Sequence, residues 1–328
     1  MYIEKFIKND KNLNKLESYF KSYNLDLDSF DKLYLAYEDE KIIASAGYYK
    51  NTLKLFTADS NYSYLNLFDK LLSILIKDMQ KLNYKNIFVF TKKAYEDMFK
   101  SFNFIKLASA EKSTLLVRTE VEVESQIKNM ADFNNPPYSS IVMNANPFTN
   151  GHEYLVKKAL ENSDRLIVFL VENDESYFPF ALRKKIALAN LKKYKNVYLV
   201  DSGDFIISSS TFPSYFLKEK NLINKDHAII DSKIFRDYFV DSIGINARYL
   251  GEEPIDPSTK IYNETLKSIL GEKIKVEIIP RLENNRGLIS ASTVRLLYKN
   301  AKFDEMKDYL SDITIDILRE YRNEHFRP

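Results

Sequence analysis

The sequence predicts an α/β protein with two domains, the second of which is built on a parallel sheet. The chain has 328 residues, which exceeds the usual size of a single domain. In its second half, short apolar segments alternate with helical segments, as they do in parallel sheets covered on both faces. The adjacent Pro136 and Pro137 end a charged connector and make a stiff, non-helical joint. We therefore predict a first domain over residues 1–118, a linker over 119–137 and a second domain over 138–328.

The composition limits the partners and the chemistry open to the chain. Lysine and arginine number 48 against 46 aspartate and glutamate residues, so the dense positive field of nucleic-acid-binding proteins is missing. There is no cysteine, which excludes disulfides, thiolate metal sites and a covalent thioester on the protein itself. Apolar segments such as residues 166–171 are too short to span a bilayer, and the first residues lack the apolar core of a signal peptide. We expect a soluble, cytoplasmic protein with no membrane or nucleic-acid partner.

For the first domain, we predict strands at 33–37, 41–46 and 52–57, a helix at 65–82, a strand at 87–90, a short helix at 94–102 and a strand at 113–118. This α+β order resembles the acetyltransferase fold called GNAT, which holds the pyrophosphate of CoA on the amides of a Gly-rich turn before the long helix. Residues 59–64 stand at that turn and contain no glycine, and Asn103 replaces a later family glycine. We expect the fold with a structural or partner-docking role in place of acetyl-CoA activity.

For the second domain, we predict strands at 140–143, 165–171, 196–200, 228–230 and 275–279, with helices between them. This alternation favours a Rossmann-like parallel sheet with helices on both faces. Such sheets bind ligands at the carboxyl ends of their strands. The segments that follow the strands are therefore the first place to look for a site.

The first strand of this domain runs directly into a segment with the sequence Asn-Ala-Asn-Pro-Phe-Thr-Asn-Gly-His, residues 144–152. Gly151 lets a polyphosphate approach the backbone, and a helix starting there directs its free amides and the positive end of its dipole to the same place. His152 can donate a hydrogen bond to a phosphate oxygen as charge develops. The alternative is a capped helix with an incidental surface histidine. Candidate nucleotide ligands here are Asn144, Asn146, Phe148, Thr149, Gly151 and His152.

A second candidate segment, residues 287–295, has the sequence Gly-Leu-Ile-Ser-Ala-Ser-Thr-Val-Arg. Ser290 or Ser292 is a good helix N-cap, and small hydroxyl residues leave the helix amides accessible. Arg295 lies one turn into that helix, where its guanidinium places a permanent, fork-shaped cation beside a phosphate. Alone, the segment is equally typical of an ordinary capped helix. We add Ser290, Ser292, Thr293 and Arg295 to the candidates.

Together, residues 149–152 and 289–295 resemble the two signatures of the nucleotidyltransferase superfamily, (H/T)xGH and ISxSxxR, with Thr149 at the variable first position. A finer resemblance, to the citrate lyase ligase family, is carried by four segments: 143–149, 206–218, 251–254 and 279–283. That resemblance implies an activity in which ATP, acetate and the thiol form of citrate lyase give AMP, pyrophosphate and the acetylated lyase. The thiol partner is a CoA-derived prosthetic group on the acyl carrier subunit of the lyase.

The chemistry of such a reaction fits the residues present. Acetate is ionised at pH 7 and needs no general base to attack the α-phosphorus, so the catalytic need is charge stabilisation and alignment. We expect His152 and Arg295 to be catalytic. Helix amides would assist them, with Mg²⁺ held mainly by phosphate oxygens and water. Without a cysteine, the acetyl group must pass directly from acetyl-adenylate to the partner's thiol.

Three further residues complete the predicted ATP site. Gly251 and Glu252 follow a strand end and are candidates for the adenine pocket, or for a simple acidic turn. Arg183 is a candidate phosphate ligand, or a solvated arginine on its helix. Two other functions remain open: a nucleotidyltransferase that adenylates a mononucleotide or pantetheine-type acceptor, and an acyl-carrier-docking protein whose second domain is inactive.

Overall fold

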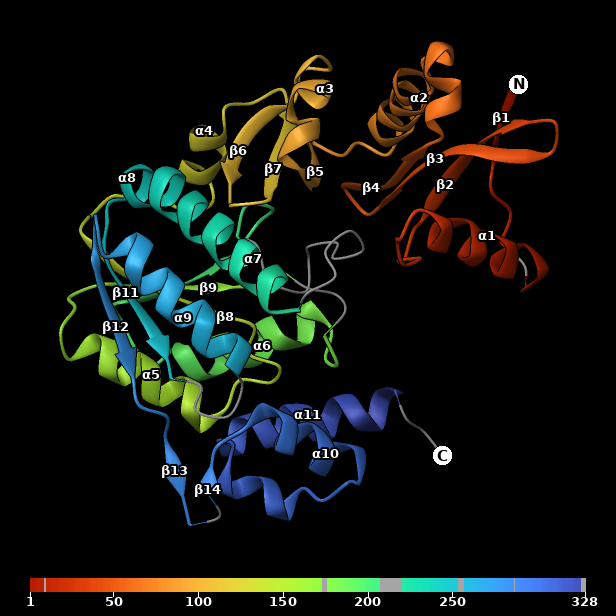
Figure 1. The fold of residues 1–328 in the computed structure, drawn as a ribbon. Coiled ribbons are helices and arrows are strands. Elements are labelled where there is room, and N and C mark those ends of the chain that lie inside the picture. The colour runs from red at the N-terminus through yellow and green to blue at the C-terminus, as the bar shows by residue number, and fades with distance from the viewer. Residues whose placement is uncertain (9, 173–175, 207–219, 253–256, 286, 326–328) are drawn as a thin grey trace. The chain divides into compact units, whose positions relative to one another are not determined.

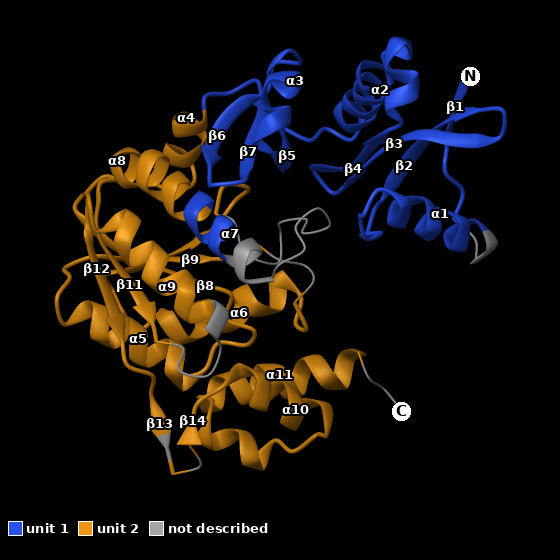
Figure 2. Cartoon of the chain, viewed as in Figure 1, with its two compact units in different colours: residues 1–122, 212–230 blue, residues 123–211, 231–328 orange. Residues whose placement is uncertain are grey.

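The computed structural model describes the chain except for residues 9, 173–175, 207–219, 253–256, 286 and 326–328. The described chain divides into two compact units (Figure 2). Unit 1 comprises residues 1–122 and 212–230, and unit 2 comprises residues 123–211 and 231–328. The first boundary thus falls inside the predicted linker, whereas the return of residues 212–230 to unit 1 has no counterpart in the sequence prediction.

Unit 1 is built on a seven-stranded sheet with the order β1-β2-β3-β4-β5-β7-β6. Its strands are β1 (Tyr2–Lys5), β2 (Lys32–Glu38), β3 (Lys41–Tyr49), β4 (Thr52–Ala58), β5 (Asn86–Lys92), β6 (Ile105–Ser109) and β7 (Ser113–Thr119). Its helices are α1 (Asp10–Ser22), η1 (Ser60–Leu65), α2 (Leu67–Lys81), η2 (Lys93–Tyr95) and α3 (Glu96–Lys100). Only β4 and β5 pair in parallel, over two residues each. The predicted α+β, GNAT-like order is confirmed.

The turn before helix α2 is occupied by an acidic side chain. Asp59 caps η1 by accepting hydrogen bonds from the Asn61 backbone N–H (3.0 Å) and the Asn61 amide (2.9 Å). Its second oxygen lies 2.8 Å from the Lys41 Nζ, and this bond lowers the pKa of Asp59, as does the Asn61 N–H. The carboxylate takes up the amide that a pyrophosphate would need there. A role for unit 1 other than acetyl-CoA binding stays a prediction.

Unit 2 is built on a five-stranded parallel sheet with the order β10-β9-β8-β11-β12. Its strands are β8 (Tyr138–Met143), β9 (Leu166–Leu170), β10 (Val197–Asp201), β11 (Ile245–Gly251) and β12 (Lys275–Ile279). From β8 the chain first builds outward through β9 and β10, and later returns to the other side of β8 with β11 and β12 (Figure 1). The order of the strands therefore reverses at β8, where open parallel sheets bind their ligands.

The helices of unit 2 are α4 (Val123–Lys128), α5 (Asn150–Leu160), α6 (Phe180–Leu191), the end of α7 (Lys220–Ile234), η3 (Phe235–Phe239), α8 (Val240–Ile243), α9 (Pro257–Leu270), α10 (Ala291–Lys299), η4 (Asp304–Asp308) and α11 (Asp312–His325). A short hairpin, β13 (Glu283–Asn284) and β14 (Gly287–Leu288), precedes α10. Among the described residues, no helix is both long and apolar enough to cross a membrane.

One predicted strand is wrong. Residues 228–230 lie inside helix α7, and the fourth strand of the sheet is β11, some fifteen residues later. A short apolar run such as Ala-Ile-Ile is compatible with a buried helix as well as with a strand, so its periodicity could not decide. His227 accordingly does not begin a strand. Its ring packs edge-on against that of Phe90 within unit 1, and the two ring centroids are 5.1 Å apart.

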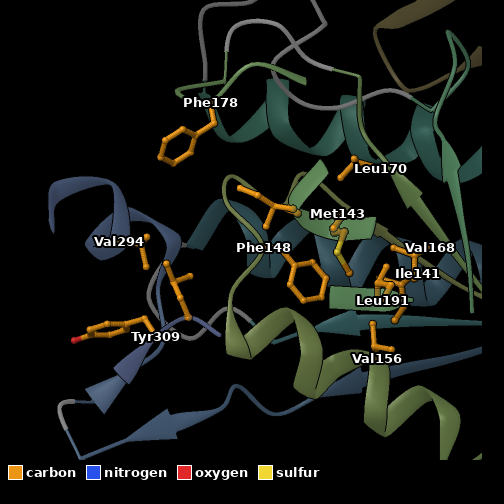
Figure 3. Packing of buried hydrophobic residues seen from close by; sticks show 14 of the residues in the cluster. Ile141, Met143, Phe148, Val156, Val168, Leu170, Phe178, Leu191, Val294 and Tyr309 are labelled. Carbon is orange, nitrogen blue, oxygen red and sulfur yellow. The ribbon is translucent and has the colours of Figure 1, made fainter. Parts of the chain in front are cut away.

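The core of unit 2 joins the sheet to the C-terminal helices. Buried side chains from β8, β9, α5, α6 and α10 form one hydrophobic cluster (Figure 3). Phe148 lies in this cluster next to Met143, at the point where the chain leaves β8. Val294 of α10 and Tyr309 belong to the same cluster. Burial of these apolar surfaces therefore fixes the segment after β8 against the start of α10.

Candidate active site

The candidate site starts with residues 144–149, here called the nucleotide loop, which connect the carboxyl end of β8 to helix α5. Ala145 adopts a left-handed backbone conformation (φ +45°), which a non-glycine residue adopts only where its surroundings enforce it. Ala145 and Phe148 are buried at 1% exposure each. Ala145 and Phe148 therefore anchor the loop in the hydrophobic core, and the polar groups of the loop are the ones that could contact a ligand.

Arg183 of helix α6 is the main polar support of this loop. Its Nη1 donates hydrogen bonds to the Asn144 carbonyl (2.6 Å), the Asn144 side-chain oxygen (3.0 Å) and the Val171 carbonyl (3.0 Å). Its Nε donates to the Phe178 carbonyl at 3.1 Å. The side chain is fully buried, with 0% exposure. These bonds hold the nucleotide loop in place. The sequence suggested a phosphate ligand or a solvated side chain, but the guanidinium is buried and bonded to backbone carbonyls.

We expect Arg183→Met to lower the free energy of unfolding by about 2 kcal/mol, because the carbonyls it satisfies would be left buried without donors. The Michaelis constant for ATP should rise as the loop loses its support. Urea denaturation and steady-state kinetics measure the two effects. Lys184→Met is the matched control, since Lys184 is the next residue and forms a half-exposed ion pair with Asp201, which is worth well under about 1 kcal/mol. Equal stability of the two variants would contradict this role for Arg183.

His152 is held in one orientation by the cap of helix α5. The Thr149 backbone N–H donates to His152 Nδ1 at 3.0 Å, and the Thr149 hydroxyl lies 2.8 Å from the same nitrogen. Because Nδ1 accepts a hydrogen bond, the ring proton is on Nε2. Burial, and secondly the charge of Arg281, lower the pKa of His152 to about 4. At pH 7 the side chain is therefore a neutral imidazole that offers Nε2–H as a donor.

Glu153 follows His152 in the first turn of α5, and the ammonium groups of neighbouring lysines compensate its negative charge. Its Oε1 accepts from the ammonium groups of Lys157 (2.9 Å) and Lys193 (2.8 Å) and from the Tyr194 hydroxyl (2.9 Å). Burial opposes ionisation of Glu153, but these bonds outweigh it and lower its pKa to about 2. The carboxylate is compensated on the side of the helix, so it does not cancel the positive end of the dipole of α5.

Arg295 connects the two predicted motifs directly. Its Nη1 donates to the Asn146 carbonyl in the nucleotide loop at 2.8 Å, and its Nη2 donates to the Ser292 hydroxyl at 2.8 Å. Ser290 caps α10 by accepting from the Ser292 N–H at 3.2 Å. Partial burial lowers the pKa of Arg295, but an arginine remains a cation at neutral pH.

The starts of helices α5 and α10 lie next to each other. A Cβ atom added to Gly151 would lie 3.6 Å from Cγ2 of Ile289, the residue before the Ser290 cap. The Asn150 N–H donates to the Tyr309 carbonyl at 2.8 Å, a second link between α5 and the C-terminal segment. The N-terminal turn of α5, which contains His152, thus lies beside the start of α10, and Arg295 of α10 reaches the loop that precedes α5. Helix N-termini and guanidinium groups are suited to anions.

Gly251 and Glu252 lie at the same edge of the sheet. They end β11, where the Glu252 N–H donates to the Ile279 carbonyl of β12 (2.8 Å) and the Asn263 amide donates to the Gly251 carbonyl (3.0 Å). Both residues are exposed. The rest of their motif, residues 253–254, and most of the segment 206–218 lie outside the described residues. The adenine pocket stays a prediction.

Sequence reasoning assigned no role to Arg281, the residue whose charge acts on His152. It stands two residues after the end of β12. A cation directly after the carboxyl end of a strand was a signal available in the sequence. A hollow of unit 2, lined by Pro136, Gly244 and Lys273 among others, lies at the opposite edge of the sheet, before β8, β11 and β12, and contains none of the candidate residues.

The fold and the site together define a class. The second domain is built on a Rossmann-like parallel sheet, and it is preceded by a domain with a GNAT-like order of elements. The family described as "Citrate lyase ligase C-terminal domain" matches residues 138–318. The [Citrate [pro-3S]-lyase] ligase of Escherichia coli (strain K12) is 32% identical over 89% of this chain and 86% of its own length, and that of Haemophilus influenzae is 29% identical over 98% and 99%. The chain belongs to the citrate lyase ligase family.

Solved structures resemble parts of the chain more distantly. Thermotoga maritima TmcAL bound with alpha-thio ATP is similar at 15% identity and a TM-score of 0.36, over 58% of this chain and 56% of that one. A Plasmodium falciparum nicotinic acid mononucleotide adenylyltransferase complexed with NaAD is similar at 18% identity and a TM-score of 0.38, over 59% and 99%. A GNAT-family acetyltransferase from Staphylococcus aureus Mu50 is similar at 17% identity and a TM-score of 0.29, over 36% and 98%.

Proposed function

We propose that this chain is an ATP-dependent ligase that acetylates the thiol of the citrate lyase acyl carrier subunit and thereby activates the lyase. The observation that carries the proposal is the bond from Arg295 to the nucleotide loop. It brings the two helix starts and His152 to one place in a chain of this family. The partner subunit, acetate as the acid and a cytoplasmic location are parts of the proposal.

In the first step, an acetate oxygen attacks the α-phosphorus of ATP. A new O–P bond forms, the bond to pyrophosphate breaks, and pyrophosphate leaves with the electron pair. No proton moves, so the site must stabilise charge and align the reactants. The Nε2–H of His152 and the guanidinium of Arg295 are suited to phosphate oxygens, because both are donors that the fold already holds in place.

Other residues would bind ATP without taking part in the bond changes. We propose that Asn146, Thr149 and Gly151 contact the phosphates of ATP near the start of α5. Ser290, Ser292 and Thr293 would contact them at the start of α10. Gly251 and Glu252 would border the adenine. Asn144 is an exposed residue of the loop whose backbone carbonyl accepts from Arg183, and Phe148 anchors the loop in the core.

The polar side chains of the nucleotide loop are those of Asn144, Asn146 and Thr149, and none of them is a carboxylate of the kind that binds a divalent cation. Mg²⁺, which would neutralise phosphate charge, is therefore expected to be held by the phosphate oxygens of ATP and by water. In the second step, the partner's thiol sulfur attacks the acetyl carbonyl carbon. A C–S bond forms, the C–O bond to AMP breaks, and the thiol proton is released. The enzyme has no cysteine, so this transfer is direct.

One assay tests the proposal. The purified chain is incubated with ATP and Mg²⁺ together with acetate, nicotinate mononucleotide or phosphopantetheine, and pyrophosphate release is measured. We expect release that depends on acetate, and a thioester on deacetylated citrate lyase when that partner is added. Release only with a mononucleotide or with phosphopantetheine would replace the ligase by a nucleotidyltransferase. No release with any acceptor would favour an inactive, carrier-docking protein.

A further inference from the structure

Arg281 stands at the same edge of the sheet as the proposed phosphate site. Strand β12 ends at Ile279, whose carbonyl accepts from the Glu252 N–H beyond the end of β11 at 2.8 Å. The chain then passes through Pro280 into Arg281. This arginine therefore follows the carboxyl end of a strand that pairs with β11, a position from which open parallel sheets contact ligands.

A second set of contacts brings the backbone around Arg281 to the start of helix α5. The Leu282 carbonyl accepts from the Ile289 N–H at 3.1 Å. Ile289 in turn packs against Gly151, where an added Cβ would lie 3.6 Å from its Cγ2. Leu282 and Ile289 belong to or pack against the same core cluster. Arg281 thus extends from a segment that is fixed beside His152 on one side and the Ser290 cap on the other.

The charge of Arg281 reaches the histidine. It adds to the effect of burial in lowering the pKa of the His152 imidazole. A cation beside a histidine is unfavourable for a protonated imidazole but compatible with a neutral one. An anion between the two groups would bond to both at once, because the guanidinium supplies charge and the Nε2–H supplies a directed donor.

We propose that Arg281 is a further catalytic residue of the adenylation step, which binds the same phosphate group as the Nε2–H of His152. This inference rests on the proposed function and deepens it. As the Pα–O bond to pyrophosphate breaks, the electron pair moves onto the leaving oxygen. Arg281 and Arg295 then supply positive charge from two different segments, and His152 supplies a neutral hydrogen bond.

The test compares Arg281→Gln and Arg281→Lys with the wild-type chain. We expect Arg281→Gln to lower kcat for acetate-dependent pyrophosphate release by about 100-fold, as for the loss of one transition-state donor, and Arg281→Lys to retain more activity. Arg319→Gln is the matched control. Arg319 is an exposed arginine on α11, so its replacement removes the same charge from the same unit and should leave kcat unchanged.

A second measurement separates contact with phosphate from a structural effect. With isotope-labelled histidine, NMR follows the titration of His152 with and without inorganic pyrophosphate. In the wild-type chain we expect pyrophosphate to raise the titration midpoint, and in Arg281→Gln we expect the free midpoint to be higher and the affinity for pyrophosphate to be at least tenfold weaker. Wild-type kcat in Arg281→Gln, or an unchanged His152 titration and pyrophosphate affinity, would overturn the inference.

The two proposals can fail separately. If the wild-type chain releases no pyrophosphate with acetate, the proposed ligase is wrong, while the pyrophosphate affinities still decide whether Arg281 belongs to a phosphate site. If the wild-type chain is active and Arg281→Gln is equally active, the ligase stands and Arg281 has no catalytic part. Should Arg281→Gln fail to fold, Arg281→Lys decides through the same pair of measurements.

Discussion

His152→Ala is expected to lower the rate of acetate-dependent pyrophosphate release by about 100-fold or more, with little change in the Michaelis constant for acetate. The variant loses the Nε2–H of a ring that the Thr149 cap holds by its other nitrogen, and the loss of one transition-state donor typically costs a factor of about 10²–10³. Rapid-quench measurement of pyrophosphate in a single turnover gives the rate of the chemical step.

Two matched variants sharpen this result. His152→Gln can place an amide N–H near the position of Nε2 and should recover part of the rate. His325→Ala removes an exposed histidine of α11, stacked on Tyr321, and should behave as the wild-type chain does. A folded His152→Ala variant with a near-normal rate would remove His152 from the mechanism.

The pH dependence follows from the same group. Because the pKa of His152 is lowered to about 4, the imidazole stays a neutral donor between pH 5 and 8. The rate should therefore lack the titration near pH 6.5 that an ordinary histidine gives. The unfolded chain binds this proton below about pH 6.5 and the folded chain only near pH 4. The contribution of His152 to stability is therefore complete above pH 6.5 and decreases as the pH falls from 6.5 toward 4.

Arg295→Ala is expected to lower the same rate by about 100-fold. The variant loses a cation at the phosphates and also the bond to the Asn146 carbonyl that ties α10 to the nucleotide loop. Arg295→Lys should recover only part of the rate, since an ammonium group cannot donate to Asn146, Ser292 and a phosphate in the geometry of the guanidinium. Steady-state kinetics with ATP as the varied substrate separate a loss in kcat from a rise in KM.

The double variant tests whether His152 and Arg295 act on one group. If both stabilise the same developing charge, the combined loss should be smaller than the product of the single losses. Independent, fully multiplicative effects would instead place the two side chains on different parts of ATP. Wild-type rates in folded Arg295→Ala would contradict the proposed site as a whole.

The sequence predicted the elements whose signals are local. The loop after β8 and the start of α10 were recognisable because glycine, cap residues and a cation stand in fixed order along the chain. Their meeting followed from the general rule for the carboxyl edge of parallel sheets. In contrast, the three apolar residues 228–230 are too few to show a periodicity, so their pattern does not distinguish a strand from a helix.

Two predicted site residues are more deeply buried than their local sequence indicates. Arg183 looks like a surface arginine on its helix, yet it is buried because carbonyls of Asn144, Val171 and Phe178, from separate segments, converge on its guanidinium. Phe148 lies in the core because apolar side chains from β8 and the C-terminal helices pack around it. Which side of a loop faces a ligand depends on contacts made by distant parts of the chain. No local pattern contains that information.

The C-terminal segment contributes half of the proposed site while lying outside the sheet. Helix α11 is fastened to α6 by the Asn190 amide, which donates to the Thr314 hydroxyl at 2.9 Å, and by the Ser311 hydroxyl, which donates to the Asn190 oxygen at 2.6 Å. A nucleotide bound between α5 and α10 would add a further contact that holds the C-terminal helices to the sheet. Substrate binding would then stabilise these helices, and the stabilisation would increase with ligand concentration as mass action requires.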